Sequence, residues 1–221
     1  MTTNKHYIVY DLETTEWLND RRGKNKGQEI HELEISVLGW YNSLTSTTKV
    51  VPVSQLKQFF RELKQVNLLV GFNSTDFDNI VIQKYTEIKI DQFPHFDMMK
   101  FIQKQCGHRV SLNNLAIGTL DREKLGQGVD APTLWKQGKI KELSEYAKHD
   151  VEITKEIFVH GCKEGFLRFK DNMSGEIRRI NTSDWVEYAR DETSGINQLK
   201  SLSSRFKLDV DIDKVREDND V

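Results

Sequence analysis

The stretch Tyr7–Thr15, YIVYDLETT, begins with apolar β-forming residues and ends with acids. The run Tyr7–Tyr10 predicts a strand buried on both faces. Asp11 and Glu13 follow two positions apart, so on an extended strand their side chains point to the same face. Two neighbouring carboxylates repel each other, and burial makes the repulsion worse. Mg²⁺ or Mn²⁺ would offset it, since both ions prefer carboxylate oxygens. The alternative is that the strand has ended and both acids face water.

A third acid, Asp78, closes the segment Gly71–Asp78, GFNSTDFD. This segment follows the apolar run Leu68–Phe72 and opens a predicted helix. Asp78 is therefore expected at the carboxyl edge of the sheet, where α/β proteins tend to bind ligands. The alternative role for an acid at this point is to stabilise the helix N-terminus, as we expect Asp76 to do.

A fourth acid, Asp150, lies in a predicted helix over residues 140–160. Tyr146 precedes it by four residues, so the two side chains share one face of the helix. That face adjoins the apolar stripe of the helix, and a buried aspartate requires a partner. The alternative is a partly exposed Tyr–Asp pair with no ligand.

Periodicity over the rest of the chain predicts an α/β fold. Strands are expected at 35–41, at 49–53 (a sheet edge, because of Pro52) and at 95–98, and a β-hairpin at 166–180. Helices are expected at 54–66 after a Ser54 cap, from Ser74 or Thr75 through Tyr85, and after a Ser111 cap. Residues 133–137 are expected to form a short turn, and further helices are expected around Trp185 and over 196–206.

The three acidic segments YIVYDLETT, GFNSTDFD and YAKHDVEIT together resemble the three exonuclease motifs of the DEDD superfamily. Their order and spacing match that pattern over roughly residues 5–160. The histidine branch of the superfamily has His five residues before the last aspartate, where this chain has Glu145, whereas Tyr146 stands four before it. The chain thus resembles the tyrosine branch, and within it the proofreading domains of family B DNA polymerases and their stand-alone bacterial relatives.

The resemblance implies an RNase H-like mixed five-stranded sheet flanked by helices, to which the residue pattern after Gly161 adds a C-terminal hairpin and helical extension. The expected domains are residues 1–160, the exonuclease domain, and residues 161–221, an extension of unknown role. The resemblance also implies two divalent cations, Mg²⁺ or Mn²⁺. Asp11 would bridge both ions, and Glu13 and Asp150 would help hold the ion that carries the attacking water. Asp78 would support the second ion, and Tyr146 would orient the water or the phosphate.

The implied activity is 3′–5′ hydrolysis of single-stranded DNA or frayed 3′ ends, releasing nucleoside 5′-monophosphates. An exoribonuclease, or a non-catalytic nucleic-acid-binding domain of a replication or repair assembly, is the alternative. The residues expected to contact the nucleic-acid substrate are Thr14, Asn73, Phe77, Arg21, Arg22 and Lys148. For Phe77 the alternative is a place in the core, and for the arginines a solvated loop.

The composition limits how the chain can bind its partners. The formal net charge is −2 and the sequence pI is near 6.3, so a nucleic acid would have to be held by local basic patches. The two cysteines predict free thiols in a reducing cytoplasm. No apolar run reaches the roughly 20 residues of a membrane span. A cytoplasmic location is therefore expected, and the sequence does not predict an oligomeric state.

Overall fold

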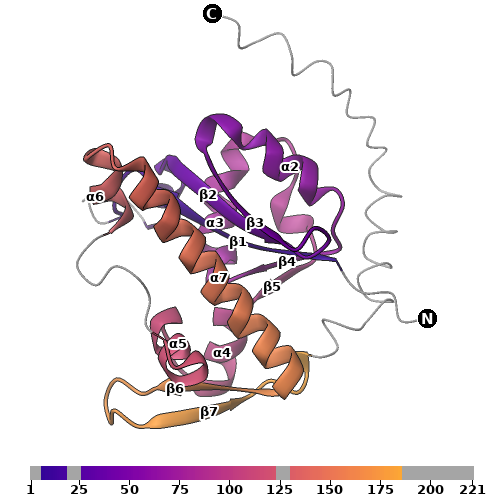
Figure 1. Cartoon of the computed structure of the whole chain (residues 1–221), viewed down its shortest axis with the longest axis vertical. Helices are drawn as coiled ribbons and strands as arrows, with labels where there is room; N and C mark the ends of the chain where they lie inside the picture. The colour runs from indigo at the N-terminus through magenta and orange to yellow at the C-terminus, as the bar shows by residue number, and fades with distance from the viewer. Residues whose placement is uncertain (1–5, 19–25, 123–129, 186–221) are drawn as a thin grey trace, which may run out of the picture.

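The structure, a computed structural model, describes residues 6–18, 26–122 and 130–185. Its centre is a mixed five-stranded sheet with the strand order β3-β2-β1-β4-β5 (Figure 1). The strands are β1 Tyr7–Thr14, β2 Ile35–Asn42, β3 Thr47–Pro52, β4 Leu68–Gly71 and β5 His95–Asp97. The central strand β1 pairs antiparallel with β2 and parallel with β4, which in turn pairs parallel with β5. The predicted RNase H-like sheet is confirmed, and Pro52 does end an edge strand.

The strand β1 has a different core on each of its faces. Ile8, Tyr10 and Leu12 pack into a cluster with residues of α1 Lys26–Glu32, α2 Lys57–Leu63 and α3 Asp78–Ile82. Val9 packs into a second cluster on the opposite face. That cluster includes residues of α4 Met98–Cys106, α5 Leu112–Leu120 and α7 Ile140–Glu164. Because side chains alternate along a strand, Asp11 and Glu13 lie on the α7 face of the sheet.

Two predicted helix starts differ from the structure. Ser54 lies inside a 3-10 turn, Val53–Gln55, and does not cap α2, which begins at Lys57. Ser74 and Thr75 likewise lie in a 3-10 turn, Ser74–Asp76, and α3 begins only at Asp78. In both cases the chain makes a tighter turn before the α-helix, so the polar residue is too early to cap it.

The predicted turn at residues 133–137 is a helix, α6 Ala131–Lys136. The Asp130 side chain accepts a 3.0 Å hydrogen bond from the Thr133 backbone N–H and so caps its N-terminus. Pro132 in the first turn needs no hydrogen-bond partner there, which suits a helix start. The predicted Ser111 cap of α5 is confirmed.

The long helix α7 crosses the sheet and continues down to the hairpin β6 Phe166–Lys170 and β7 Ile177–Asn181 (Figure 1). The hairpin is as predicted, and its buried residues Leu167, Phe169 and Ile180 pack into the core cluster that contains Val9 of β1. At Gly161 an added Cβ would lie 2.4 Å from the Trp185 ring, so this glycine lets the tryptophan pack against the helix. The helix runs through the domain boundary expected at residue 160.

The helical extension expected after Trp185 falls outside the described residues. Cys106 and Cys162 are free thiols, as expected. Among the helices that the structure describes, none combines the length and the apolar character needed to cross a bilayer.

Candidate metal centre

Three of the four predicted acids meet between β1 and α7. Asp11, Glu13 and Asp150 each offer one carboxylate oxygen, and these oxygens all lie within 4.8 Å of one another. Asp150 is buried, whereas the two acids of β1 are partly exposed. Three carboxylates so close together repel one another unless a cation or protons balance their charge. Since all the donors are hard oxygens, the set suits Mg²⁺ or Mn²⁺ and not a thiophilic metal.

A glycine in the neighbouring strand lets α7 reach this centre. Gly39 of β2 pairs directly with Asp11. A Cβ added at Gly39 would lie 2.9 Å from Val151 Cγ2 and 3.3 Å from the Ala147 carbonyl oxygen, both on α7. The helix therefore rests on the bare backbone of β2. This close approach brings Asp150, which precedes Val151, to the acids of β1.

Tyr146 lies in the same electrostatic environment. Its pKa is raised well above the ordinary tyrosine value, first by burial and then by the negative charges of Asp150, Glu13 and Asp11. The ring packs against a small apolar cluster that includes Ala131 and Leu143. Tyr146 therefore keeps its proton at neutral pH and can donate a hydrogen bond.

The fourth predicted acid, Asp78, lies outside the three-acid group. It is buried at the start of α3, and its Oδ1 accepts a 3.1 Å hydrogen bond from the Leu12 backbone N–H. Burial raises the pKa of Asp78 to about 7; the Leu12 hydrogen bond acts against this shift and the nearby Asp97 adds to it. Asp78 is not part of the three-acid group, but it is attached to the strand that carries two of them.

The turn between β4 and α3 is organised by Asp97, which sequence reasoning missed. Its carboxylate accepts hydrogen bonds from the Asn73 backbone N–H at 2.9 Å and from the Thr75 backbone N–H and hydroxyl at 3.0 and 2.7 Å. It also caps α4 through the Met99 N–H.

The backbone of this turn is tight. Asn73 has a left-handed φ of 64°, and an added Cβ at Gly71 would clash with Ser74. The available signal was an acid between a strand and a helix, at the same sheet edge as Asp78.

The residues predicted to contact the nucleic-acid strand do not gather in one place among the described residues. The Thr14 hydroxyl is buried and donates to the Glu16 carbonyl at 2.7 Å, and Phe77 packs partly against the core. The Asn73 side-chain oxygen accepts a hydrogen bond from Arg109.

Of the predicted basic residues, the structure describes Lys148. Lys148 is exposed, and it stands two residues from both Tyr146 and Asp150 in the sequence. A separation of two residues is a rotation of about 200° around α7, so Lys148 lies on nearly the opposite side of the helix from both. Arg21 and Arg22 lie outside the described residues.

An aromatic residue that carried no sequence prediction follows the first acidic motif. Trp17 follows Glu13 by four residues and is partly exposed, and the Lys136 ammonium group lies 4.4 Å from its ring centroid. Lys136 ends α6, a helix that contacts β1. A ring and a cation at this position offer stacking to a base and charge to a phosphate.

The comparisons with known proteins agree with this fold. A family model described as the RNase_H superfamily matches residues 34–161. The match includes Asp78, Tyr146 and Asp150, and it begins after Asp11 and Glu13. No curated protein matches the chain.

Among solved structures, the family B DNA polymerase from the hyperthermophilic archaeon Pyrobaculum calidifontis is similar to 71% of this chain, with a TM-score of 0.51 and 15% sequence identity. The chain covers 24% of that polymerase, so the likeness concerns the fold of one part of it.

Proposed function

The chain belongs to the RNase H superfamily, and from this premise we propose that it is a metal-dependent 3′–5′ exonuclease of the tyrosine branch of the DEDD superfamily. The observation that carries the proposal is the meeting of Asp11, Glu13 and Asp150 within 4.8 Å, with Tyr146 in their electrostatic field. A protein that only bound nucleic acid would gain nothing from holding three repelling acids together. A hydrolase requires such a group to hold cations at the scissile phosphate.

The four acids would hold two divalent cations. Asp11, Glu13 and Asp150 are the direct ligands in this proposal, and Asp78 supports the second ion from its buried position. When bound, such ions make hydroxide available near neutral pH and stabilise the charge of the leaving 3′ oxygen. The hydrogen bond from the Leu12 backbone N–H supports this role for Asp78, because it fixes the carboxylate against the strand that carries Asp11 and Glu13.

Tyr146 serves as a hydrogen-bond donor in this mechanism. Its raised pKa keeps the phenol protonated, so it does not act as a base at neutral pH. Its hydroxyl orients the attacking water or a non-bridging phosphate oxygen. The terminal phosphodiester is then cut by in-line attack, and a nucleoside 5′-monophosphate leaves.

The proposed substrate is the single-stranded 3′ end of DNA, with RNA as the alternative. Trp17, which follows the first acidic motif, and Lys136, whose ammonium group lies over its ring, would stack on a base and attract a phosphate. The proposed setting is the cytoplasm, in DNA repair or replication. The one observation that favours a role within an assembly is that the similar structure is part of a larger DNA polymerase.

A gel assay tests the proposal directly. The full chain is incubated with 5′-labelled single-stranded DNA or matching RNA in Mg²⁺, Mn²⁺ or EDTA. We expect a ladder that shortens from the 3′ end, appears only with a divalent ion and stops when the 3′ hydroxyl is blocked. Digestion of the blocked strand from its 5′ end would contradict the polarity. No cleavage with any ion would favour the non-catalytic binding domain.

A further inference from the structure

A surface hollow of about 370 Å³ lies between the loop that follows α4 and the inner face of the β6–β7 hairpin. The loop contributes His108, Arg109 and Val110, and α5 contributes Asn114. The hairpin contributes residues of both strands and of the turn that joins them. None of these residues belongs to the three acidic motifs, so the proposed chemistry leaves the hollow unexplained.

The charge of this hollow is positive although the chain as a whole is slightly negative. Arg109, Lys170 and Arg178 line it, together with His108 and a single acid, Asp171. That acid is already engaged: its Oδ1 accepts hydrogen bonds from the backbone N–H groups of Met173 and Ser174 at 2.8 and 3.0 Å. Its Oδ2 lies 3.1 Å from Arg178 Nε. The positive charge of Arg109 and Lys170 is thus not balanced by an acid of the hollow's lining.

One contact links the hollow to the turn that follows β4. Arg109 is exposed, and its guanidinium donates a hydrogen bond to the Asn73 side-chain oxygen. Asn73 lies in the turn that ends at Asp78, and Asp97 fixes the backbone of that turn. The hollow is thus attached, through Arg109 and Asn73, to the turn that leads to Asp78.

The hairpin turn adds an apolar contact. Met173, at the turn, is 99% exposed, and Phe169 forms part of the floor with its ring 6.1 Å from that of His108. A fully exposed methionine beside cationic side chains suits a ligand with both apolar and anionic parts. Nucleotides have this alternation, because flat bases branch from a charged backbone.

We propose that this hollow binds the phosphodiester backbone of the single strand on the 5′ side of its 3′-terminal nucleotide, an inference that rests on the proposed function. Arg109 and Lys170 contact successive phosphates, and Met173 packs against a base. The hairpin thereby acts as a second holding point for the strand, beyond the residues at the metal centre. An acidic peptide has the charge but lacks the bases, and it is the competitor against which the test is designed.

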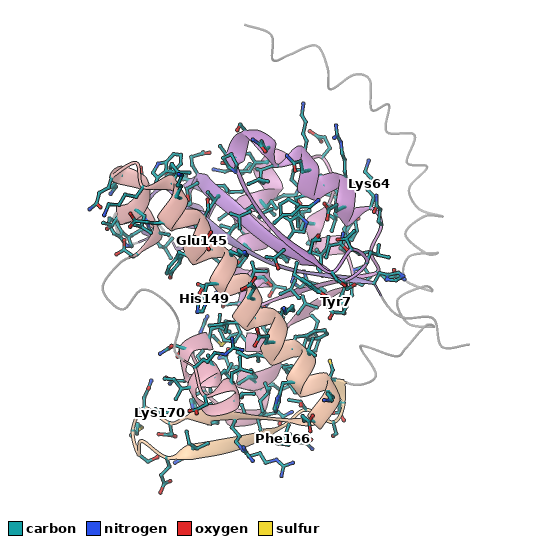
Figure 2. The ribbon with its side chains drawn as sticks, in the orientation of Figure 1. Tyr7, Lys64, Glu145, His149, Phe166 and Lys170 are labelled. Atoms are coloured by element: carbon teal, nitrogen blue, oxygen red, sulfur yellow. The ribbon has the colours of Figure 1, made fainter. Side chains whose placement is uncertain are left out.

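The test measures binding without cleavage. Full-length protein is titrated in EDTA against a 5′-fluorescein 12-nucleotide single-stranded DNA, with anisotropy read at several salt concentrations. The variants are Arg109→Gln with Lys170→Gln, and separately Met173→Ser. The control is Lys64→Gln, which removes one charge at the opposite end of the molecule from Lys170 (Figure 2).

The charge variant should bind on the order of tenfold more weakly at low salt, and its log–log salt dependence should be shallower by about 0.7 for each lost phosphate contact. Met173→Ser should bind about threefold more weakly with an unchanged salt slope, because an apolar contact with a base releases no counterions. Lys64→Gln should match the wild type.

Equal affinity and equal slope for the charge variant and the Lys64→Gln control would overturn the proposal. Equal competition by a 12-residue poly-aspartate would also overturn it, since the hollow would then be a general anion surface. The outcome is independent of the gel assay. A protein that cleaves but shows no variant effect refutes the hollow alone, whereas one that shows the effect but never cleaves refutes the exonuclease alone.

Discussion

The backbone N–H of Leu12 donates a 3.1 Å hydrogen bond to the Asp78 carboxylate. Leu12 stands between Asp11 and Glu13, beyond the last residue of β1 that pairs with β4. The Asp78 side chain thus takes the place that a neighbouring strand would occupy. The position of Asp78 relative to β1 is therefore fixed by a main-chain contact. This contact does not depend on how the partly exposed side chains of Asp11 and Glu13 are oriented.

Asp11→Asn should abolish cleavage without unfolding the protein. The substitution keeps the side-chain shape but removes one of the three charges that would hold the cations, which should lower the rate by at least about 100-fold. In EDTA the variant should melt at the same temperature as the wild type or above it, because repulsion within the acid group is reduced. Unchanged cleavage would remove the metal-centre assignment.

Tyr146→Phe should weaken cleavage by about tenfold, since it removes a single orienting hydrogen bond. Asp150→Asn removes a ligand charge and should cost at least about 100-fold. Single-turnover rates of the two variants on the same strand make the comparison. If Tyr146→Phe proved the more damaging change, the phenol would have a larger part in the chemistry than donation from a protonated hydroxyl.

Gly39→Ala should impair cleavage from outside the metal centre. The added methyl group would lie 2.9 Å from Val151 Cγ2, so α7 must move away from β2 and carry Asp150 with it. We expect a loss of about 1–3 kcal/mol in the free energy of unfolding and a weaker apparent affinity for Mn²⁺.

The control for this change is Gly165→Ala, at the far end of α7. There the φ of 72° strains any side chain, but the new methyl would meet only Ser183 at 3.7 Å. This variant should lose stability, by about 1 kcal/mol, and keep its Mn²⁺ affinity. Equal loss of Mn²⁺ affinity in both variants would mean that the effect is one of general stability.

His95 should make the fold sensitive to mild acid. Burial lowers the pKa of His95 to about 4, and its ring contacts the Ser74 hydroxyl at 2.8 Å and the Asn79 amide at 3.3 Å. The unfolded chain binds a proton near pH 6.5, whereas the folded chain does so only near pH 4. Stability is therefore full above pH 6.5 and falls as the pH drops toward 4, by about 3 kcal/mol in total.

Urea unfolding of the wild type and of His95→Gln at pH 7 and pH 4.5 measures this contribution. The wild type should lose about 2–3 kcal/mol more than the variant between the two conditions. The comparison cancels the titration of carboxylates that both proteins share. Parallel losses would show that His95 takes up its proton at the same pH in the folded and unfolded chains.

The parts of the fold that sequence predicted correctly depend on local patterns. The strands β1, β2 and β4 are short apolar runs with clear ends, and α7 has an unbroken apolar stripe, so each was recognisable without its neighbours. The acids that meet in the candidate centre stood out for the same reason: carboxylates interrupt patterns that are otherwise apolar. Ser54, Ser74 and Thr75 were misjudged as caps, because a 3-10 turn and a cap begin with the same polar residues.

The features that sequence missed depend on contacts between distant segments. Asp97 organises the Asn73 turn from 22 to 24 residues away in sequence, and Arg109 reaches Asn73 across 36 residues. The role of Gly39 appears only when α7, more than a hundred residues later, rests on it. No periodicity records such pairs, since neither partner is unusual in its own segment.

The 25 residues of α7 form a rod of about 37 Å that carries Asp150 near its middle and meets the hairpin at its C-terminal end. Successive residues of an α-helix are rotated by about 100° around the helix axis. Inserting a single residue between Asp150 and Gly161 would swing the hairpin around the helix axis, while a seven-residue insertion, close to two full turns, would restore its direction and only lengthen the spacing. Related chains should therefore vary freely in the loops around this helix while keeping the count of residues within it.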